Sequence, residues 1–515
     1  MDKAFFKDFM KDIPRGDSTR DLSQQYAPCA QWMKLEDIAA NKDLAFDPHN
    51  PGAKVLIGAL GSQLIGIDDD RHIMTVAGSR SGKSVGLISN LFFYRGSVLA
   101  TDPKGELANI TAERRAKLGQ KIYVLDPFLI ASDAIGKYRA AYNPMVILKP
   151  DNPNFLEDAA LIAEALVVQS GQEKDPHWDE SAKAFIEAVI VHVATAPQYA
   201  DARNLITVRY LISRALWNSL DMDALDSPEA SDNPALLQDI KLNAASLRDA
   251  PLTEDIGNSL IAGAMDFYLK AEAERAGVYS TVNRHTRFLD YTAFRNVLCD
   301  NDFDLGELKR NPNGVSVYLC FPATRADISR RWMRLFINQL LDAMDREKTK
   351  PKVPVLACLD EFPVLGYMKQ LETAAGLIAS FGVRLWFILQ DWSQGKALYG
   401  DRWETFAGNA GTMQFFGNND LATTEYISRR LGKTLVQVTR LGEVGSEQRD
   451  KGLLGKSVST ELHDLLDPAE VTQQFSRDDK LKKQVIFLAG NHPIMLQRTN
   501  WHDNNGPLAK FITSN

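Results

Sequence analysis

The chain is poor in the features that mark disulfide-bonded and zinc-binding proteins. Its 515 residues include only four cysteines, and no two of them form a C-x-x-C pair. Such spacing argues against a disulfide framework and against a cysteine zinc site, and it is typical of a protein in a reducing compartment. We expect Cys358, which lies in an apolar run, to be a small buried residue.

Long hydrophobic runs are also missing. The N-terminal stretch MDKAFFKDFMKDIPRGD is charged and interrupted by proline, unlike a secretory signal. The longest apolar candidate, residues 53–67, is shorter than the roughly 18–20 residues that a transmembrane helix requires. Gly58 and Gly61 favour a β-hairpin there. We therefore expect the chain as given not to cross a membrane.

The composition shows no excess of basic residues. There are 59 Lys and Arg against 66 Asp and Glu, a formal net charge of −7. Net charge gives no argument for nucleic-acid binding, although it hides how the charges are distributed. The densest basic cluster consists of Arg325, Arg330, Arg331 and Arg334. A solvated helix face is the simplest interpretation of this cluster, and contact with DNA or with another subunit is the alternative.

What the chain does have is a series of short apolar runs of strand length. The runs are continuous rather than alternating, which is typical of strands buried on both faces of a parallel sheet. They lie at residues 72–77, 97–102, 121–126, 315–321, 353–360, 384–390, 412–417 and 484–490. Helical stretches separate most of them, so the sequence predicts an α/β fold with a mostly parallel sheet.

This alternation is interrupted between residues 151 and 290, where helical patterns occur without a convincing strand. One such helix follows Asp175, a possible cap, and Pro176, which suits a first helical position. We predict an irregular segment at 1–55, a nucleotide-binding domain in two parts at 56–150 and 291–515, and an all-α domain at 151–290. The polar region 442–460 predicts a long loop.

The stretch VAGSRSGKSVG, residues 76–86, is nearly a phosphate-binding loop. The pattern G-x-x-x-x-G-K-[ST] begins with glycine, where this chain has Ala77, but Gly78 follows at once and can supply the same freedom. In such loops backbone N–H groups surround the phosphates, the lysine reaches the terminal ones, and the hydroxyl residue holds Mg²⁺. The predicted ATP-binding residues are Gly78, Ser79, Arg80, Ser81, Gly82, Lys83 and Ser84. Lys83 is also a candidate catalytic residue and Ser84 a candidate Mg²⁺ ligand.

A second motif supplies carboxylates. The apolar strand in PVLACLDEFPVLG ends in Asp360, which would hold Mg²⁺ through water, and Glu361, which would polarise the attacking water as general base. Gln390 ends another apolar run, where it could sense the γ-phosphate; a plain strand-end glutamine fits the spacing equally well. We predict that the loop and the Asp–Glu pair meet at one Mg-triphosphate. This set is typical of additional-strand ATPases, which act as rings.

Several stretches occur in an order that resembles the TraG/TraD-like coupling proteins of type IV secretion, over about residues 55–500. They are AGSRSGKSVG, LATDPKGEL, LDPF, YNP, HWDESA, LDEFPVLG, LQDWSQ and GNAGTMQFFGNND. That family often has alanine at the first loop position. The resemblance implies a RecA-like domain with an inserted all-α domain, assembled as a homo-hexamer around a channel.

The resemblance also implies a function. Such proteins couple ATP hydrolysis to the delivery of relaxase-bound DNA, or of effector proteins, into a type IV secretion channel at the cytoplasmic face of the inner membrane. Two features depart from the family pattern. The usual N-terminal membrane anchor is missing, so membrane association would depend on partners or on an absent segment. Ala379 and Ser380 stand where many relatives have an arginine that acts across the subunit border, and Arg384 comes only later.

Three alternatives remain from the sequence. The same motor could carry protein effectors only, an FtsK-like or HerA-like DNA translocase could share the fold, or a docking platform could use nucleotide mainly to order its assembly. The DPKGEL stretch and the helical insertion favour the coupling family over a general translocase. The intact Asp360–Glu361 pair favours hydrolysis over a platform.

Overall fold

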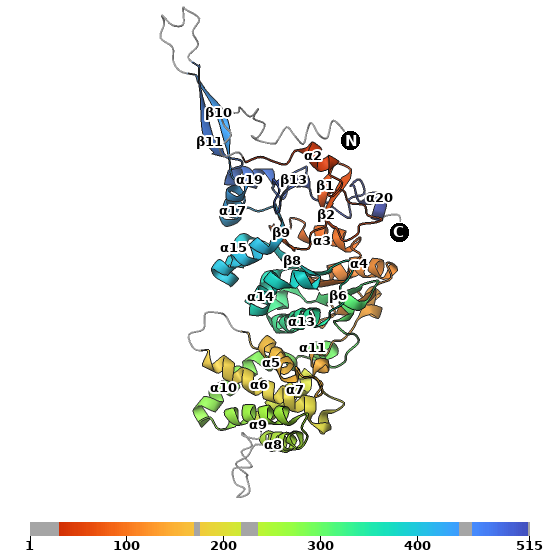
Figure 1. Cartoon of the computed structure of the whole chain (residues 1–515), viewed down its shortest axis with the longest axis vertical. Helices are drawn as coiled ribbons and strands as arrows, with labels where there is room; N and C mark the ends of the chain where they lie inside the picture. Colours follow the sequence, from red (N-terminus) through yellow and green to blue (C-terminus); the bar gives the residue numbers. More distant parts are fainter. Residues whose placement is uncertain (1–29, 169–175, 218–234, 442–455, 513–515) are drawn as a thin grey trace, which may run out of the picture. The chain divides into compact units, whose positions relative to one another are not determined.

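The computed structural model describes residues 30–168, 176–217, 235–441 and 456–512 (Figure 1). They divide into two compact units. The first unit contains the described residues up to Arg95 and those from Arg384 on, and the second unit spans Gly96 to Val383. Each unit is described by itself below.

The first unit is built on a mixed sheet in which the strand before the phosphate loop is central. The strands follow the order β2 (Gln63–Ile67), β1 (Val55–Leu60), β13 (Ile494–Gln497), β12 (Lys483–Leu488), β9 (Ala410–Phe416), β3 (His72–Ala77) and β8 (Val383–Leu389). Strand β3 is fully buried and parallel to both β8 and β9, whereas the strands beyond β9 pair antiparallel. The carboxyl ends of β8, β3 and β9 therefore meet at one edge, where ligands bind in open α/β sheets.

Helices cover this sheet, and some of them begin at a side-chain cap. They are α2 (Leu35–Ala40), α3 (Lys83–Leu91), α15 (Trp392–Tyr399), α16 (Trp403–Asn409), α17 (Leu421–Leu431), α19 (Pro468–Gln474) and α20 (Ala509–Ile512). The Asp420 side chain accepts a hydrogen bond from the Thr423 amide at the start of α17, and Asp467 forms a capping box with Glu470 at the start of α19. The cap of α17 comes shortly after the carboxyl end of β9.

The first unit also carries a long two-stranded hairpin, β10 (Lys433–Leu441) and β11 (Lys456–Asp464), which Figure 1 shows extending away from α17 and α19. The loop predicted at 442–460 is therefore wrong for residues 456–460, which belong to β11, while 442–455 lie outside the described residues. The stretches TLVQVT and KSVST contain several β-branched residues, which favour strands, but their polar composition hid this signal.

The second unit contains a parallel sheet with the strand order β7 (Val355–Leu359), β4 (Val98–Asp102), β6 (Val315–Cys320) and β5 (Lys121–Leu125). Strands β4, β6 and β7 are buried along their whole length, as expected from continuous apolar runs. The helices beside this sheet include α4 (Glu106–Lys117), α13 (Ala326–Arg346) and α14 (Lys369–Leu377).

A helical region is inserted between β5 and β6. Its helices are α5 (Phe155–Leu166), α6 (His177–Thr195), α7 (Leu205–Trp217), α8 (Ala235–Arg248), α9 (Glu254–Tyr268), α10 (Glu272–Thr286), α11 (Thr292–Leu298) and α12 (Glu307–Arg310). Phe185 of α6 stacks on Phe267 of α9 with ring centroids 3.9 Å apart. Asp179 in the HWDESA stretch binds Arg284 and His285 of α10, each at 3.0 Å, so that stretch joins α6 to α10.

The structure confirms the α/β fold with a mostly parallel sheet and a helical insertion. All eight apolar runs form strands, residues 53–67 form the β1–β2 hairpin with its turn at Gly61, and Cys358 is buried. The sequence did not predict β13, a strand of only four residues. In the described part of the chain, every helix is too short or too polar to span a bilayer.

Candidate nucleotide-binding site

The phosphate loop tolerates alanine at its first position because the glycine requirement falls one residue later. Ala77 is the buried last residue of β3 and has no positive φ. A Cβ atom on Gly78 would lie 2.0 Å from the carbonyl oxygen of Gly417, a contact that no side chain permits. Ala77 is therefore no defect, as the sequence predicted.

The loop then turns sharply into α3. Gly82 has φ 101° and Arg80 has φ 59°, and both values lie in the left-handed region. Ser81 donates from its amide and its hydroxyl to the carbonyl oxygen of Gly78, which closes the turn. Helix α3 begins at Lys83, so its unsatisfied N–H groups and its dipole favour an anion at this point.

The side chains of the loop fit a magnesium-bound phosphate. The ammonium group of Lys83 donates to the carbonyl oxygen of Ala77 at 3.0 Å, so it lies at the mouth of the loop. Ser84, in the first turn of α3, is half-buried, and its hydroxyl has no hydrogen bond within the described residues. Ser79 and Arg80 are exposed. A hydroxyl oxygen of this kind is a suitable ligand for Mg²⁺.

A cavity of about 850 Å³ adjoins the loop within the first unit, a volume in the range of ligand sites. Gly78 and Ser79 line one side of it, and Gln390, at the carboxyl end of β8, lines another. The structure thus brings Gln390 and the start of the phosphate loop to one cavity. Asn419 and Arg477, which sequence reasoning did not assign to the site, also line it.

Gly417, in the GNND stretch after β9, lets two loops approach closely. It has φ 62°, and a Cβ atom there would lie 2.2 Å from Oγ of Ser81. The Gly417 amide donates to the carbonyl oxygen of Phe475 at 2.6 Å, and the Gly78 amide donates to that of Phe416 at 3.3 Å. The stretch 416–417 therefore lies between the phosphate loop and the chain that follows α19.

Arg498, which directly follows β13 and lies outside every recognised motif, holds the backbone of the phosphate loop. Its Nη1 donates to the carbonyl oxygen of Ser81 at 2.6 Å and its Nε to that of Lys482 at 3.2 Å. Nη2 reaches the carbonyl oxygens of Ser476 and Arg477, each at 3.4 Å. Burial lowers the pKa of Arg498. A lone arginine after a strand carries no sequence signal, which is why sequence reasoning missed it.

The predicted Asp–Glu pair follows β7 in the second unit. Asp360 is buried, accepts the Glu361 amide at 3.0 Å, and receives the Thr101 hydroxyl of β4 on its backbone oxygen at 2.8 Å. Glu361 has φ 52°, a strained value for a residue with a side chain, and such strain is found at functional sites. That the pair meets the loop at one nucleotide stays a prediction.

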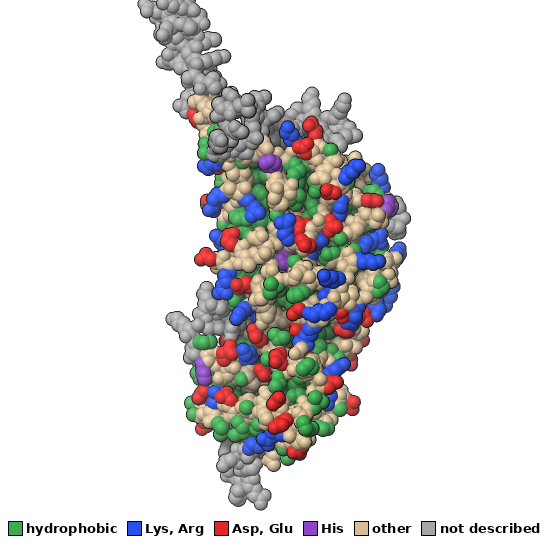
Figure 2. All heavy atoms as spheres, viewed as in Figure 1, with side chains coloured by type: hydrophobic (Ala, Val, Ile, Leu, Met, Phe, Trp, Pro, Cys, Tyr) green, Lys and Arg blue, Asp and Glu red, His purple; other side chains and the backbone are tan. Residues whose placement is uncertain are grey.

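Two arginines of the basic cluster hold the segment after this pair. Arg334 is buried and donates to the carbonyl oxygens of Leu365 and Tyr367, and Arg330 donates from Nε to that of Val364 at 2.9 Å. The burial of Arg334 within its own chain therefore contradicts, for this residue, both the hypothesis of a solvated helix face and that of a DNA contact. On the face drawn in Figure 2, basic side chains are intermixed with acidic ones over the helical region.

Two Asp-Pro stretches, DPKGEL and LDPF, have architectural roles. Asp102 accepts the Ala108 amide at 2.9 Å, and Asp126 accepts the Ile130 and Ala131 amides at 3.0 and 2.8 Å. Each carboxylate thus stabilises, through these hydrogen bonds, the turn that follows its strand. Burial raises the pKa of Asp102 to about 6.

Arg384 is held inside the first unit. Its side chain is 1% exposed, with Nη1 on the carbonyl oxygen of Ala53 at 3.1 Å and Nη2 at 3.4 Å from Asp68. A side chain bound in this way is not available to a neighbouring subunit.

Residues 31–514 match the family described as Type IV secretory system Conjugative DNA transfer. The chain belongs to this family. It is therefore a coupling protein of type IV secretion, as the ordered motifs predicted, and an FtsK-like or HerA-like translocase is disfavoured.

The relatives in this family are distant but similar over long stretches. The chain is 24% identical over 503 residues to the type IV secretion system-coupling protein VirD4 of Bartonella quintana (strain Toulouse), covering 91% of this chain and 72% of that protein. It is 27% identical over 408 residues to a conjugal transfer protein TraG of Escherichia coli, covering 75% of this chain and 58% of TraG.

Solved structures of a coupling protein share the fold. The bacterial conjugative coupling protein TrwBdeltaN70, in its unbound monoclinic form, aligns with a TM-score of 0.56 at 14% identity, over 85% of this chain and 88% of that chain. The plasmid coupling protein TrwB in complex with ADP and Mg²⁺ aligns with a TM-score of 0.57 at 15% identity, over 83% and 85%. These similarities establish the fold.

Proposed function

We propose that the chain hydrolyses ATP with Mg²⁺ and uses the energy to feed relaxase-bound DNA into a type IV secretion channel. The geometry of the phosphate loop is the observation that carries this proposal. Position 78 requires glycine because the Gly417 backbone passes so close to it. Gly82 has a positive φ, and the Lys83 ammonium group lies at the mouth of the loop. The solved complex of TrwB with ADP and Mg²⁺ supports the same choice of ligands.

Each candidate residue has a distinct role in this proposal. Lys83 exchanges its bond to the Ala77 carbonyl oxygen for one to a phosphate oxygen. Gln390, on the cavity beside the loop, orients toward the terminal phosphate. Glu361 takes the proton of the attacking water. Ser84 and Asp360 would hold Mg²⁺, which neutralises charge on the phosphate oxygens.

The proposal extends to assembly and place. We infer a homo-hexamer that receives its DNA–relaxase cargo on the helical region and acts at the cytoplasmic face of the inner membrane, beside the channel components. The family description, conjugative DNA transfer, supports DNA as cargo. Transport of effector proteins alone is the second candidate, and a pull-down that compares a relaxase complex with effectors separates the two.

The test is an ATPase assay combined with a mass measurement, with and without single-stranded and double-stranded DNA. We expect Mg²⁺-dependent hydrolysis that increases when DNA is added to the hexamer. Lys83→Ala is the matched control, because it removes the phosphate-binding ammonium group from an otherwise unchanged loop. Hydrolysis by a hexameric preparation that neither form of DNA alters would contradict the DNA motor.

A further inference from the structure

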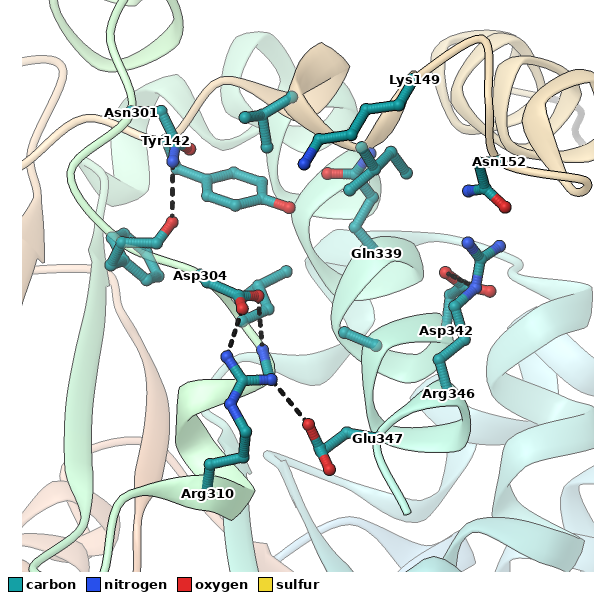
Figure 3. A pocket seen from close by; sticks show the side chains of 16 residues that line it. Tyr142, Lys149, Asn152, Asn301, Asp304, Arg310, Gln339, Asp342, Arg346 and Glu347 are labelled. Carbon is teal, nitrogen blue, oxygen red and sulfur yellow. Dashed lines mark hydrogen bonds and ion pairs between the residues drawn. The ribbon is translucent and has the colours of Figure 1, made fainter. Parts of the chain in front are cut away.

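The second unit contains a cavity of about 500 Å³ that is separate from the phosphate loop (Figure 3). Three segments line it: residues 142–152, which lead from β5 into the helical region, residues 301–310, which return from it, and the last two turns of α13. Both connections of the helical region therefore meet at this cavity. Its volume falls within the range of small-molecule sites.

Two arginines on the wall of the cavity each bind two carboxylates. Arg310 pairs with Asp304 and with Glu347, as Figure 3 shows. Arg346 pairs with Asp342 at 2.9 Å and with Asp158. Asp158 is fully buried and does not line the cavity. The two arginines are therefore matched on the lining by three carboxylates, those of Asp304, Asp342 and Glu347, which leaves one surplus negative charge.

Lys149 carries the remaining positive charge. Its side chain points into the cavity in Figure 3, and its ammonium group has neither an ion pair nor a hydrogen bond within the described residues. Gln339, on the same cavity, is only 5% exposed, and its Oε1 has no hydrogen-bond partner among the described residues. A buried acceptor without a donor costs about 1–3 kcal/mol, which favours occupation or rearrangement at this point.

We propose that this cavity binds a small zwitterion that carries one carboxylate and one ammonium group, as a free amino acid or a short peptide does. The carboxylate pairs with Lys149, and the ammonium group lies against Asp304 or Asp342. A purely anionic ligand would face the surplus negative charge of the lining carboxylates, and a purely cationic one would face Lys149. Burial, together with Asp158 and Asp345, raises the pKa of Asp342 against the opposing effect of Arg346, so an added cation is favourable there.

Occupation of the cavity has a structural consequence. The ligand would contact the outgoing connection through Lys149 and the returning one through Asp304, next to α13. It would thus tie both connections to the same helix. The inference stands apart from ATP hydrolysis, because none of these residues belongs to the phosphate loop or to the Asp–Glu pair.

Calorimetric titration of the full, nucleotide-free chain tests this site. Glycine and triglycine are the probes, since they share both charged groups and differ in length, and tighter binding of one identifies a free amino acid or a peptide as the ligand. We expect saturable binding that weakens by about tenfold or more when a charge partner is removed in Lys149→Gln or Asp304→Asn. N-acetylglycine and glycinamide, which each lack one charge, should also bind at least about tenfold more weakly.

Lys348→Gln is the matched control, because this exposed lysine of the same unit does not line the cavity. It should bind both probes as the unaltered chain does, and all three variants should keep their affinity for ATP. The absence of saturable binding for both probes, or equal binding by Lys149→Gln and the unaltered chain, would overturn the proposal.

Discussion

Nη1 of Arg498 lies 2.6 Å from the carbonyl oxygen of Ser81, across 417 positions of sequence. The same guanidinium group reaches Ser476 and Lys482, so one side chain joins the phosphate loop to the chain that follows α19. That chain continues into Arg477, which lines the cavity beside the loop. The shape of the loop therefore depends on a contact that closes the unit from its C-terminal end.

Replacement of Arg498 by lysine should weaken ATP binding. A single ammonium group cannot span four carbonyl oxygens as the planar guanidinium does, so the loop loses its fixed shape while the charge is kept. We expect KM for ATP to rise about tenfold, the loss of one or two hydrogen bonds to a charged group, with a smaller change in kcat.

Arg429→Lys is the control, since the Arg429 side chain is 79% exposed and far in sequence from the loop. The thermal unfolding midpoint of both variants is measured alongside, because a merely structural arginine would lower the midpoint without moving KM. An unchanged KM in Arg498→Lys would exclude a positioning role.

Exchange of glycine and alanine should abolish nucleotide binding at position 78 and leave it unchanged at position 77. Gly78→Ala places a methyl group 2.0 Å from the Gly417 carbonyl oxygen, so it should destabilise the chain by about 2 kcal/mol or more and abolish nucleotide binding. Ala77→Gly should cost about 1 kcal/mol of stability through backbone entropy and leave nucleotide affinity unchanged. A nucleotide titration checks both, and wild-type affinity in Gly78→Ala is the contrary result.

Asp102 should make stability depend on pH. Its pKa is about 6 in the folded chain against an ordinary 3.8, because burial favours the neutral form. The raised pKa contributes stability below about pH 4, and this contribution is lost as the pH rises through about 6, amounting to about 3 kcal/mol. The asparagine in Asp102→Asn does not titrate. The unfolding midpoint of this variant should therefore rise relative to that of the wild-type chain as the pH increases.

Thermal unfolding at about pH 4.5 and about pH 7.5 measures this difference. Asp133→Asn is the control, because the Asp133 side chain is 96% exposed and its removal should not change the slope. Parallel pH profiles of Asp102→Asn and the unaltered chain would show that Asp102 keeps an ordinary pKa.

Removal of the Arg334 guanidinium group should slow hydrolysis and spare binding. Arg334→Met keeps the apolar stem but releases the carbonyl oxygens of Leu365 and Tyr367, so the segment after Glu361 keeps only its bond to Arg330. We expect kcat to fall about tenfold, a part of the roughly 100-fold or more that a positioned base contributes, with ATP affinity within about twofold. Lys369→Met, an exposed change on α14, should alter neither. Loss of ATP affinity in Arg334→Met would contradict this division of roles.

The sequence predicts those parts of the molecule whose residues act locally. Strands β3 and β7 are continuous apolar runs because both of their faces are buried, and the loop and the Asp–Glu pair follow directly from their ends. Gln390 follows β8 for the same reason. These motifs could be located from the sequence because each directly follows, in the chain, a strand that the apolar runs already identify.

The contacts between distant segments could not be predicted. Arg498 and Arg334 bind backbone carbonyl oxygens, and such acceptors exist at every residue, so no partner type marks them in the sequence. The need for glycine at position 417 depends on how closely two loops pass. In the sequence, nothing distinguishes the buried Arg384 from a surface arginine, because its acceptors on Ala53 and Asp68 are known only from the structure.

The central claim is that the loop lysine binds ATP and that Glu361 drives its hydrolysis. It is tested most directly by measuring ATP binding and Mg²⁺-dependent hydrolysis side by side in the wild-type chain, Lys83→Ala and Glu361→Gln. We predict that Lys83→Ala loses both activities, while Glu361→Gln binds ATP normally and hydrolyses it about 100-fold or more slowly. Hydrolysis at the wild-type rate by Glu361→Gln would contradict the account.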